Sequence, residues 1–172
     1  MTSRKMSSSS SSLATASRFS GAGRVFAAGA HLAEARAGLA TSPVWERLSC
    51  AVAALPGLTI AALNGTLAGG ANGMALACDI RIAAPHAKFF YPVMKLGYLP
   101  QPSDPARLAA LVGPARAKLM LMGGQKLSAE EALTYGLIER IVPAEDEPTV
   151  TRDLAADTLG GNRERGMGHR AV

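Results

Sequence analysis

Cysteine is scarce in this chain of 172 residues, which contains only Cys50 and Cys78. Two cysteines cannot build the disulfide framework of a small secreted domain, and this usage fits a reducing compartment. The three histidines are scattered along the chain and do not complete a zinc-binding spacing with the cysteines. We therefore expect neither a metal site nor a redox cofactor.

Aromatic residues are also few, at 5% of the chain, while hydrophobic residues as a whole make up 48%. The hydrophobic share is normal for a globular protein and excludes wholesale disorder. The core must then consist mainly of alanine, leucine, isoleucine, valine and methionine. The length indicates one domain and is sufficient to bury such a core.

Acidic residues are absent from the first 33 residues, which carry Arg4, Lys5, Arg18 and Arg24. The whole chain has 18 basic and 13 acidic residues, so the part after residue 33 is nearly neutral. A folded surface that binds nucleic acid needs a basic stripe, often interleaved with aromatic residues. We therefore expect no nucleic-acid partner.

Charge is missing altogether from residues 48–78, a stretch long enough to raise the question of a membrane span. Turn-forming residues interrupt this stretch at Pro56, Gly57, Asn64, Gly65, Gly69, Gly70, Asn72 and Gly73. A spanning helix needs about 20 consecutive apolar residues, and no such run occurs here. The pattern instead predicts a buried strand, a loop and a helix, with no membrane association.

Residues 1–20 contain a run of serines from Ser7 to Ser12 and no acidic residue. Such a segment buries too little apolar surface to offset the entropy of ordering it. It is interpreted as a disordered tail, with an organelle transit segment as the alternative. We accordingly expect a cytoplasmic protein, or a mitochondrial one if the transit interpretation holds.

Strand and helix signals alternate along the rest of the chain. Short apolar or alternating runs predict strands over 58–63, 79–83 and 137–142. Helical composition covers much of 32–55, broken at Ser42-Pro43, and then 71–78, 106–112 and 114–122. Ser128 and Glu131 form a capping-box pattern that opens a helix ending near Gly136. This alternation indicates an α/β fold.

Two segments stand out, GRVFAAGAHL at residues 23–32 and IAALNGTLAGGANGMALACD at residues 60–79. Shorter blocks follow in order: LGYLP at 96–100, LVG at 111–113, LSAEEA at 127–132, GLI at 136–138 and VP at 142–143. Together they resemble the crotonase family (enoyl-CoA hydratase/isomerase) over about residues 21–145. The resemblance implies a ClpP/crotonase-like spiral of repeated ββα units, here incomplete at both ends. It places the core at 21–145 and leaves 146–172 as a disordered tail.

The resemblance also implies an oxyanion hole, in which two backbone N–H groups polarise the carbonyl of an acyl-CoA thioester. The two donors map onto the N–H groups of Ala30 and Gly70. Glycines at positions 69 and 70 suit this role because, lacking a Cβ, they let a ligand approach the backbone. The alternative is that Gly69-Gly70 is only a tight turn with close helix packing.

Further substrate contacts follow from the same resemblance. Arg24 and the backbone of Ala28 map near the adenosine end of coenzyme A, although Arg24 also fits an ordinary surface charge. The remaining positions map around the thioester and acyl group: Ala30, His31, Leu32, Gly69, Gly70, Gly73 and Val93. His31 is either a group acting in catalysis or a surface residue at a helix start.

The chain departs from the family at its acids. Family hydratases use two glutamates around a water molecule, and these positions hold Gly73 and Val93, which cannot transfer a proton. Some family isomerases carry a single acid at the position of Gln101. Asp104 lies close by and is the candidate substitute acid, with a turn-capping role as the alternative.

Two functions therefore stay open. One is an acyl-CoA enzyme of fatty acid metabolism, of the lyase or isomerase class, that stabilises an enolate-like intermediate. The other is a non-catalytic homologue or truncated fragment that binds only coenzyme A thioesters or family partners. In both cases coenzyme A enters as part of the substrate, and the resemblance implies a trimer-type homo-oligomer.

Overall fold

The computed structural model describes residues 16–23, 25–27 and 38–160, which form two four-stranded sheets. The first sheet has the order β1 (Ala16–Ser20), β3 (Leu58–Leu63), β5 (Ile80–Ala83) and β8 (Arg140–Ile141). The second has the order β2 (Val25–Ala27), β4 (Thr66–Ala68), β6 (Lys88–Phe90) and β7 (Leu127–Ser128). All neighbouring strands are parallel except β6 and β7, which are antiparallel.

Consecutive strands alternate between the two sheets. The chain passes from β1 to β2, from β3 to β4 and from β5 to β6, so each pair adds one strand to each sheet. After β4, the 3-10 helix η2 (Gly69–Ala71) and α3 (Asn72–Leu76) complete a strand–strand–helix unit. The expected spiral of ββα units is therefore confirmed.

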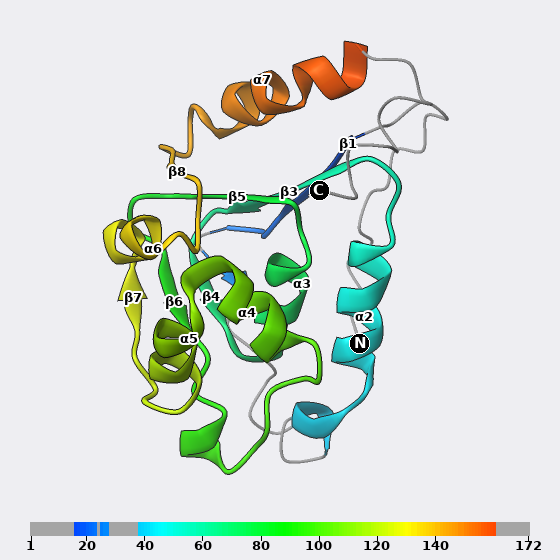
Figure 1. The fold of residues 1–172 in the computed structure, drawn as a ribbon. Coiled ribbons are helices and arrows are strands. Elements are labelled where there is room, and N and C mark those ends of the chain that lie inside the picture. Colours follow the sequence, from blue (N-terminus) through cyan, green and yellow to red (C-terminus); the bar gives the residue numbers. More distant parts are fainter. Residues whose placement is uncertain (1–15, 24, 28–37, 161–172) are drawn as a thin grey trace.

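The other helices pack around these sheets (Figure 1). They are η1 (Leu39–Thr41), α2 (Val44–Ala53), η3 (Met94–Leu96), α4 (Asp104–Val112), α5 (Pro114–Leu121), α6 (Ala129–Tyr135) and α7 (Glu147–Gly160). Figure 1 shows α7 on one side of the first sheet, with α3 and α4 on the other. Among the residues that the structure describes, no helix is both long and apolar enough to span a bilayer.

The core lies between the sheets and α3, α4 and α5. As the composition predicts, its buried side chains are mostly alanine and aliphatic residues. Two aromatic residues, Phe89 and Tyr91, are nevertheless its largest fully buried side chains. Tyr91 brings a hydroxyl group into this apolar interior, and a buried hydroxyl requires a polar partner.

Two expectations of disorder are wrong. Residues 16–20, counted with the serine-rich tail, form β1, which pairs with β3 from Ala16 to Ser20. Residues 147–160, counted with the C-terminal tail, form α7. Arg18 on β1 donates from its Nε to the Oε1 atom of Glu147 on α7 at 2.7 Å, so the two elements are also joined to each other.

The composition of α7 explains why the sequence did not reveal it. Within this helix only Thr151 and Ala155 are fully buried, so no continuous apolar stripe marks it. Thr151 donates its hydroxyl to Glu147 at 2.7 Å, which adds a polar contact one helical turn away. The helix is therefore held by packing against β1 and β3 rather than by a strong pattern of its own.

The remaining predicted elements that fall on described residues are confirmed with shifted ends, while the helical composition at 32–37 lies outside the described residues. The predicted strand at 58–63 is β3, and that at 79–83 is β5. The strand expected at 137–142 is shorter, because Leu137 donates its N–H back to Ala132 at 2.8 Å and packs into the core. Helix α2 begins at Val44, directly after the predicted break at Ser42-Pro43.

The capping box at the start of α6 allows a local prediction of stability. The Ser128 hydroxyl accepts the Glu131 N–H at 3.2 Å, and the Glu131 carboxylate accepts the Ser128 N–H at 2.8 Å. We expect Ser128→Ala to lower the free energy of unfolding by about 1 kcal/mol, because a helix N–H loses its partner. Urea denaturation measures this change, with Ser128→Thr as the control that keeps a cap. Equal losses in both variants would contradict the prediction.

Candidate functional site

The Gly69-Gly70 pair lies where β4 ends and the chain turns into a helix. Gly69 has a φ of +65°, a left-handed conformation that glycine adopts without steric cost. Gly70 follows as the central residue of η2, which continues into α3. The glycine at position 69 is therefore needed for the chain to turn.

Asn72 fixes the orientation of the peptide between the two glycines. Its side-chain Nδ2 donates to the carbonyl oxygen of Gly69 at 2.8 Å and to that of Phe90 at 3.2 Å. The backbone N–H of Asn72 also bonds to the carbonyl of Gly69. Because the C=O of Gly69 and the N–H of Gly70 belong to one planar trans peptide, they point in opposite directions. Holding the carbonyl toward Asn72 therefore aims the Gly70 N–H the other way.

The indole ring of Trp45 lies directly against Gly70. A Cβ placed on Gly70 would lie 2.8 Å from the Cδ2 atom of Trp45. The ring is also held by a hydrogen bond, because Trp45 Nε1 donates to the carbonyl of Leu39 at 2.8 Å. The absence of a side chain at position 70 thus allows α2 to approach the turn closely.

Gly73, one helical turn beyond Gly70, lies against the carboxylate of Asp104. A Cβ placed on Gly73 would lie 2.7 Å from Asp104 Oδ1 and 3.1 Å from Oδ2. Asp104 is the first residue of α4 and is only 1% exposed. The space next to Gly73 is therefore filled by a carboxylate from another helix.

A single hydrogen bond from a side chain holds the Asp104 carboxylate. The Tyr91 hydroxyl donates to Asp104 Oδ2 at 2.7 Å and accepts the backbone N–H of Gln101 at 3.4 Å. The other oxygen, Asp104 Oδ1, is buried without a hydrogen-bond partner. Such an atom is unusual in a folded protein, because an unsatisfied buried acceptor is costly.

Burial raises the pKa of Asp104 to about 6. The Tyr91 hydrogen bond acts in the opposite direction, while the negative charge of Glu46 adds to the rise and the positive charge of Arg107 lowers it. Burial and the neighbouring Asp104 charge also raise the pKa of Tyr91, so its hydroxyl stays a neutral donor. The pair thus combines a weak buried acid with a fixed hydrogen-bond donor.

Polar contacts connect α2 to the start of α4. The Glu46 carboxylate accepts the Ser103 hydroxyl at 3.1 Å and the Ser103 N–H at 3.3 Å. Arg107 donates to the Ser49 hydroxyl at 2.9 Å. Desolvation tends to raise the pKa of Glu46, but the hydrogen bonds from Ser103 and Cys50 outweigh it and keep that pKa below its usual value. Helix α2 therefore holds Trp45 and the N-terminus of α4 together around the glycine turn.

Four of the predicted site residues lie together in the structure: Gly69, Gly70, Gly73 and Asp104. Val93 is 8% exposed and belongs to the same core cluster as Tyr91. The other predicted site residues lie outside the described residues: Arg24, Ala28, Ala30, His31 and Leu32. In the described part of the chain, no group of three or more histidine, cysteine or acidic side chains is placed to hold a metal ion.

Sequence reasoning missed the roles of Asn72 and Trp45. Asn72 was visible only as a turn former in an uncharged stretch, although it lies only two residues after the glycine pair. Trp45 is the only tryptophan of the chain, but nothing in its local pattern connects it with Gly70. The contacts of Trp45 with Gly70 and of Asn72 with Phe90 depend on the tertiary fold, whereas the hydrogen bond from Asn72 to Gly69 spans only three residues.

Comparison with known proteins gives a consistent result. The family model described as enoyl-CoA hydratase/isomerase matches residues 15–162. A probable enoyl-CoA hydratase of Mycobacterium tuberculosis is 42% identical over 97 residues, which cover 56% of this chain and 38% of the relative. A carnitinyl-CoA dehydratase of Salmonella arizonae is 41% identical over 96 residues, covering 56% of this chain and 37% of the relative. The matched part thus spans well under half the length of these relatives.

Solved structures extend the match to nearly the whole chain. An enoyl-CoA hydratase from Bacillus anthracis is 31% identical with a TM-score of 0.81, covering 91% of this chain and 63% of that one. An enoyl-CoA hydratase/carnithine racemase from Magnetospirillum magneticum is 28% identical with the same TM-score of 0.81, covering 91% of this chain and 61% of that one. By sequence and by fold, this chain belongs to the enoyl-CoA hydratase/isomerase (crotonase) family.

Proposed function

We propose that this chain binds an acyl-CoA thioester and polarises its carbonyl with the backbone N–H groups of Gly70 and Ala30. The observation that carries the proposal is the fixed peptide between Gly69 and Gly70, whose carbonyl is held by Asn72. A donor held before the ligand arrives costs no reorganisation at the moment of reaction, which is the basis of oxyanion stabilisation. Membership of the family supplies the class of ligand.

The remaining contacts of the ligand are proposed from the family pattern. Arg24 and the backbone of Ala28 would face the adenosine end of coenzyme A, with His31 and Leu32 next to the thioester. Val93, buried in the core cluster, would contact the acyl group. The core at 21–145 would carry all of these contacts, in a trimer-type homo-oligomer of the cytoplasm, and coenzyme A would be needed only as part of the substrate.

The substitutions at the acid positions limit the reaction. Gly73 and Val93 stand where family hydratases have their two glutamates, so no pair of carboxylates is present there to act as acid and base on a water molecule. Hydration by such a pair is therefore not proposed. Polarisation of the thioester is still useful to an enzyme that moves a proton at the neighbouring carbon. The second candidate, a homologue that binds thioesters without turnover, is favoured by the same two substitutions.

The single tryptophan provides a direct test of thioester binding. Because Trp45 lies against Gly70, a thioester seated there should change its fluorescence. We expect saturable titration with a β,γ-unsaturated hexenoyl-CoA, with a dissociation constant in the micromolar range, about −8 kcal/mol. Calorimetry on the same samples measures binding independently of the fluorophore.

Free coenzyme A is the matched control, because it carries the nucleotide but no thioester carbonyl. It should bind more weakly and change the Trp45 signal less. Trp45→Phe should remove the fluorescence change while leaving heat of binding detectable. A folded protein, judged by circular dichroism, that gives neither heat nor a fluorescence change would overturn the proposal.

A further inference from the structure

A groove runs between α7 and strand β1. Figure 1 shows α7 on one side of the first sheet, whereas α3, which follows the glycine turn, lies on the other. The groove has a volume of about 320 Å³, at the lower end of the range of about 300–1,000 Å³ for pockets that bind small molecules. Its lining residues come from β1, β3 and α7, so the groove is separate from the proposed thioester site.

Apolar side chains line most of this groove. Ile60 of β3 and Ala155 of α7 are 1% and 4% exposed, so they lie at its bottom. Leu159, in the last turn of α7, lines the groove but is 51% exposed. Ala155 and Leu159 are four residues apart and therefore share one face of the helix. An alkyl chain lying in the groove would bury the exposed part of Leu159 against this face.

Both charged residues that line the groove are basic, Arg18 and Arg152. The charge of Arg18 is balanced, because this residue pairs with Glu147. Arg152 is exposed and forms no ion pair with any described residue. The helix itself offers it no acidic partner, because the positions three and four residues away hold Pro148, Thr149, Ala155 and Ala156. The groove therefore carries one unbalanced positive charge, which favours an anionic ligand.

The contact of Arg18 shows which anion suits an arginine at this place. Its Nε and Nη2 donate to the two carboxylate oxygens of Glu147 at 2.7 and 2.5 Å. This arrangement uses the match between the planar guanidinium group and the planar carboxylate. Arg152 presents the same group one helical turn before Ala155. A carboxylate bound to Arg152 would thus place an attached chain against Ala155 and Leu159.

We propose that the groove between β1 and α7 binds a medium-chain carboxylate, which pairs with Arg152 and lays its alkyl chain against Ile60, Ala155 and Leu159. The site is independent of the proposed thioester site. In α7 only Thr151 and Ala155 are fully buried, so the ligand adds apolar contacts to a sparsely packed helix. Binding therefore stabilises the packing of α7 against the first sheet.

Titration with octanoate, followed by the backbone amide NMR signals of the full chain, tests the proposal. We expect saturable shifts at residues 16–18 and 148–159, with a dissociation constant of about 1 mM or lower for a ligand of this size. Octylammonium is the matched ligand control, because it has the same chain length and the opposite charge. It should bind at least about tenfold more weakly, because its charge repels that of Arg152.

Two variants separate the charge from the apolar surface. Arg152→Gln should weaken octanoate binding about tenfold or more, because a charge-assisted hydrogen bond is lost. Arg47→Gln, the same change at an exposed position of α2, is its control and should leave the affinity unchanged. Leu159→Ser should weaken binding about three- to tenfold through lost apolar contact. Leu133→Ser, at a 42% exposed position of α6, is the control for that change.

Three results would each overturn the proposal. The first is a folded chain that shows no saturable shift at about 20 mM octanoate, well above the expected dissociation constant. The second is binding that Arg152→Gln does not weaken, or that octylammonium equals. The third is a set of shifts centred on residues 69–73 with a change in Trp45 fluorescence, which would place octanoate at the glycine turn. Thioester binding is measured separately with hexenoyl-CoA, so it stands or falls independently of these results.

Discussion

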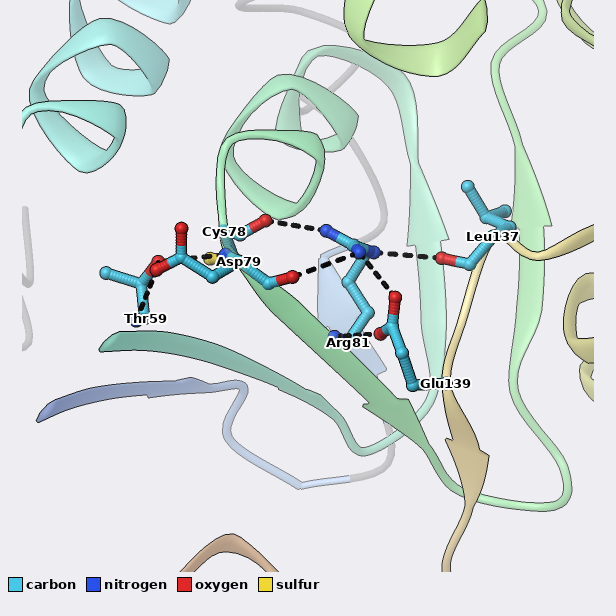
Figure 2. A network of polar contacts seen from close by, with 6 residues as sticks. All are labelled: Thr59, Cys78, Asp79, Arg81, Leu137 and Glu139. Atoms are coloured by element: carbon cyan, nitrogen blue, oxygen red, sulfur yellow. Dashed lines mark hydrogen bonds and ion pairs between the residues drawn. The ribbon is translucent and has the colours of Figure 1, made fainter. Parts of the chain in front are cut away.

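Replacing Arg81 with methionine should destabilise the fold by at least about 3 kcal/mol, the largest loss of stability that we expect from a single substitution in this chain. Arg81 lies on β5 and is 3% exposed. Figure 2 shows its guanidinium group among the ends of several segments. It donates to the carbonyls of Cys78 at 2.6 Å and Leu137 at 3.0 Å, and to the Glu139 carboxylate at 2.6 Å.

The size of the expected loss follows from what methionine leaves behind. Methionine fills a similar volume but donates no hydrogen bond, so the carbonyls of Cys78 and Leu137 each lose a buried donor. Each buried acceptor left unpaired costs about 1–3 kcal/mol. Glu139 is 40% exposed and can be solvated by water, so it adds little to the loss. The carbonyls, rather than the ion pair, therefore dominate the effect.

Chemical denaturation monitored by circular dichroism measures this loss. Arg140→Met, on the exposed neighbouring strand β8, is the control and should change the free energy of unfolding by no more than about 0.5 kcal/mol. Arg81→Lys keeps the charge but cannot reproduce the planar fork, so its loss should lie between the two. If Arg81→Met were as stable as Arg140→Met, the guanidinium contacts would not be stabilising.

The same network shows why parts of this fold are readable from sequence. The strand that carries Arg81 was predicted from the alternation of apolar and polar residues over 79–83. Asp79, directly before this strand, accepts the Thr59 N–H at 2.7 Å and the Thr59 hydroxyl at 2.6 Å, a contact between residues 20 apart in sequence that the pattern did not indicate (Figure 2). Signals that depend on residues close in sequence, such as the capping box of Ser128 and Glu131, are reliable.

Contacts between residues that are far apart in sequence cannot be predicted in this way. The sequence indicated that Gly73 lacks an expected carboxylate and that Asp104 was a candidate acid, but it did not indicate that the two residues touch. Their contact results from the packing of α4 against α3, which Glu46 supports from a third helix. The glycine turn was predictable because it is local, whereas the contacts of Trp45 with Gly70 and of Asn72 with Phe90 are defined by tertiary structure.

The last prediction concerns Asn72 and the direction of the Gly70 N–H. Asn72→Asp is nearly isosteric but replaces the donating Nδ2 with an oxygen. This oxygen would face the carbonyls of Gly69 and Phe90, which Nδ2 approaches at 2.8 and 3.2 Å. Two acceptors cannot share a hydrogen bond without a proton, so the Gly69 carbonyl should turn away and rotate the Gly70 N–H with it. We expect deuterium exchange at the carbon next to the thioester carbonyl, measured in heavy water by mass spectrometry, to fall about 10²-fold or more, as when an oxyanion donor is lost.

Comparing the loss of exchange rate with the loss of affinity shows whether Asn72 positions the Gly70 N–H or only supports the fold. Because the oxyanion forms only during the reaction, the loss should appear in the exchange rate at saturating thioester, with a smaller change in affinity. Asn64→Asp is the matched control: its Nδ2 donates to the carbonyl of Gly23 at 2.6 Å, so the same change removes a comparable contact away from the glycine turn. Asn64→Asp should lower stability but not the saturated exchange rate. If folded Asn72→Asp exchanged as fast as Asn64→Asp, the Gly70 N–H would not be the group that stabilises the enolate.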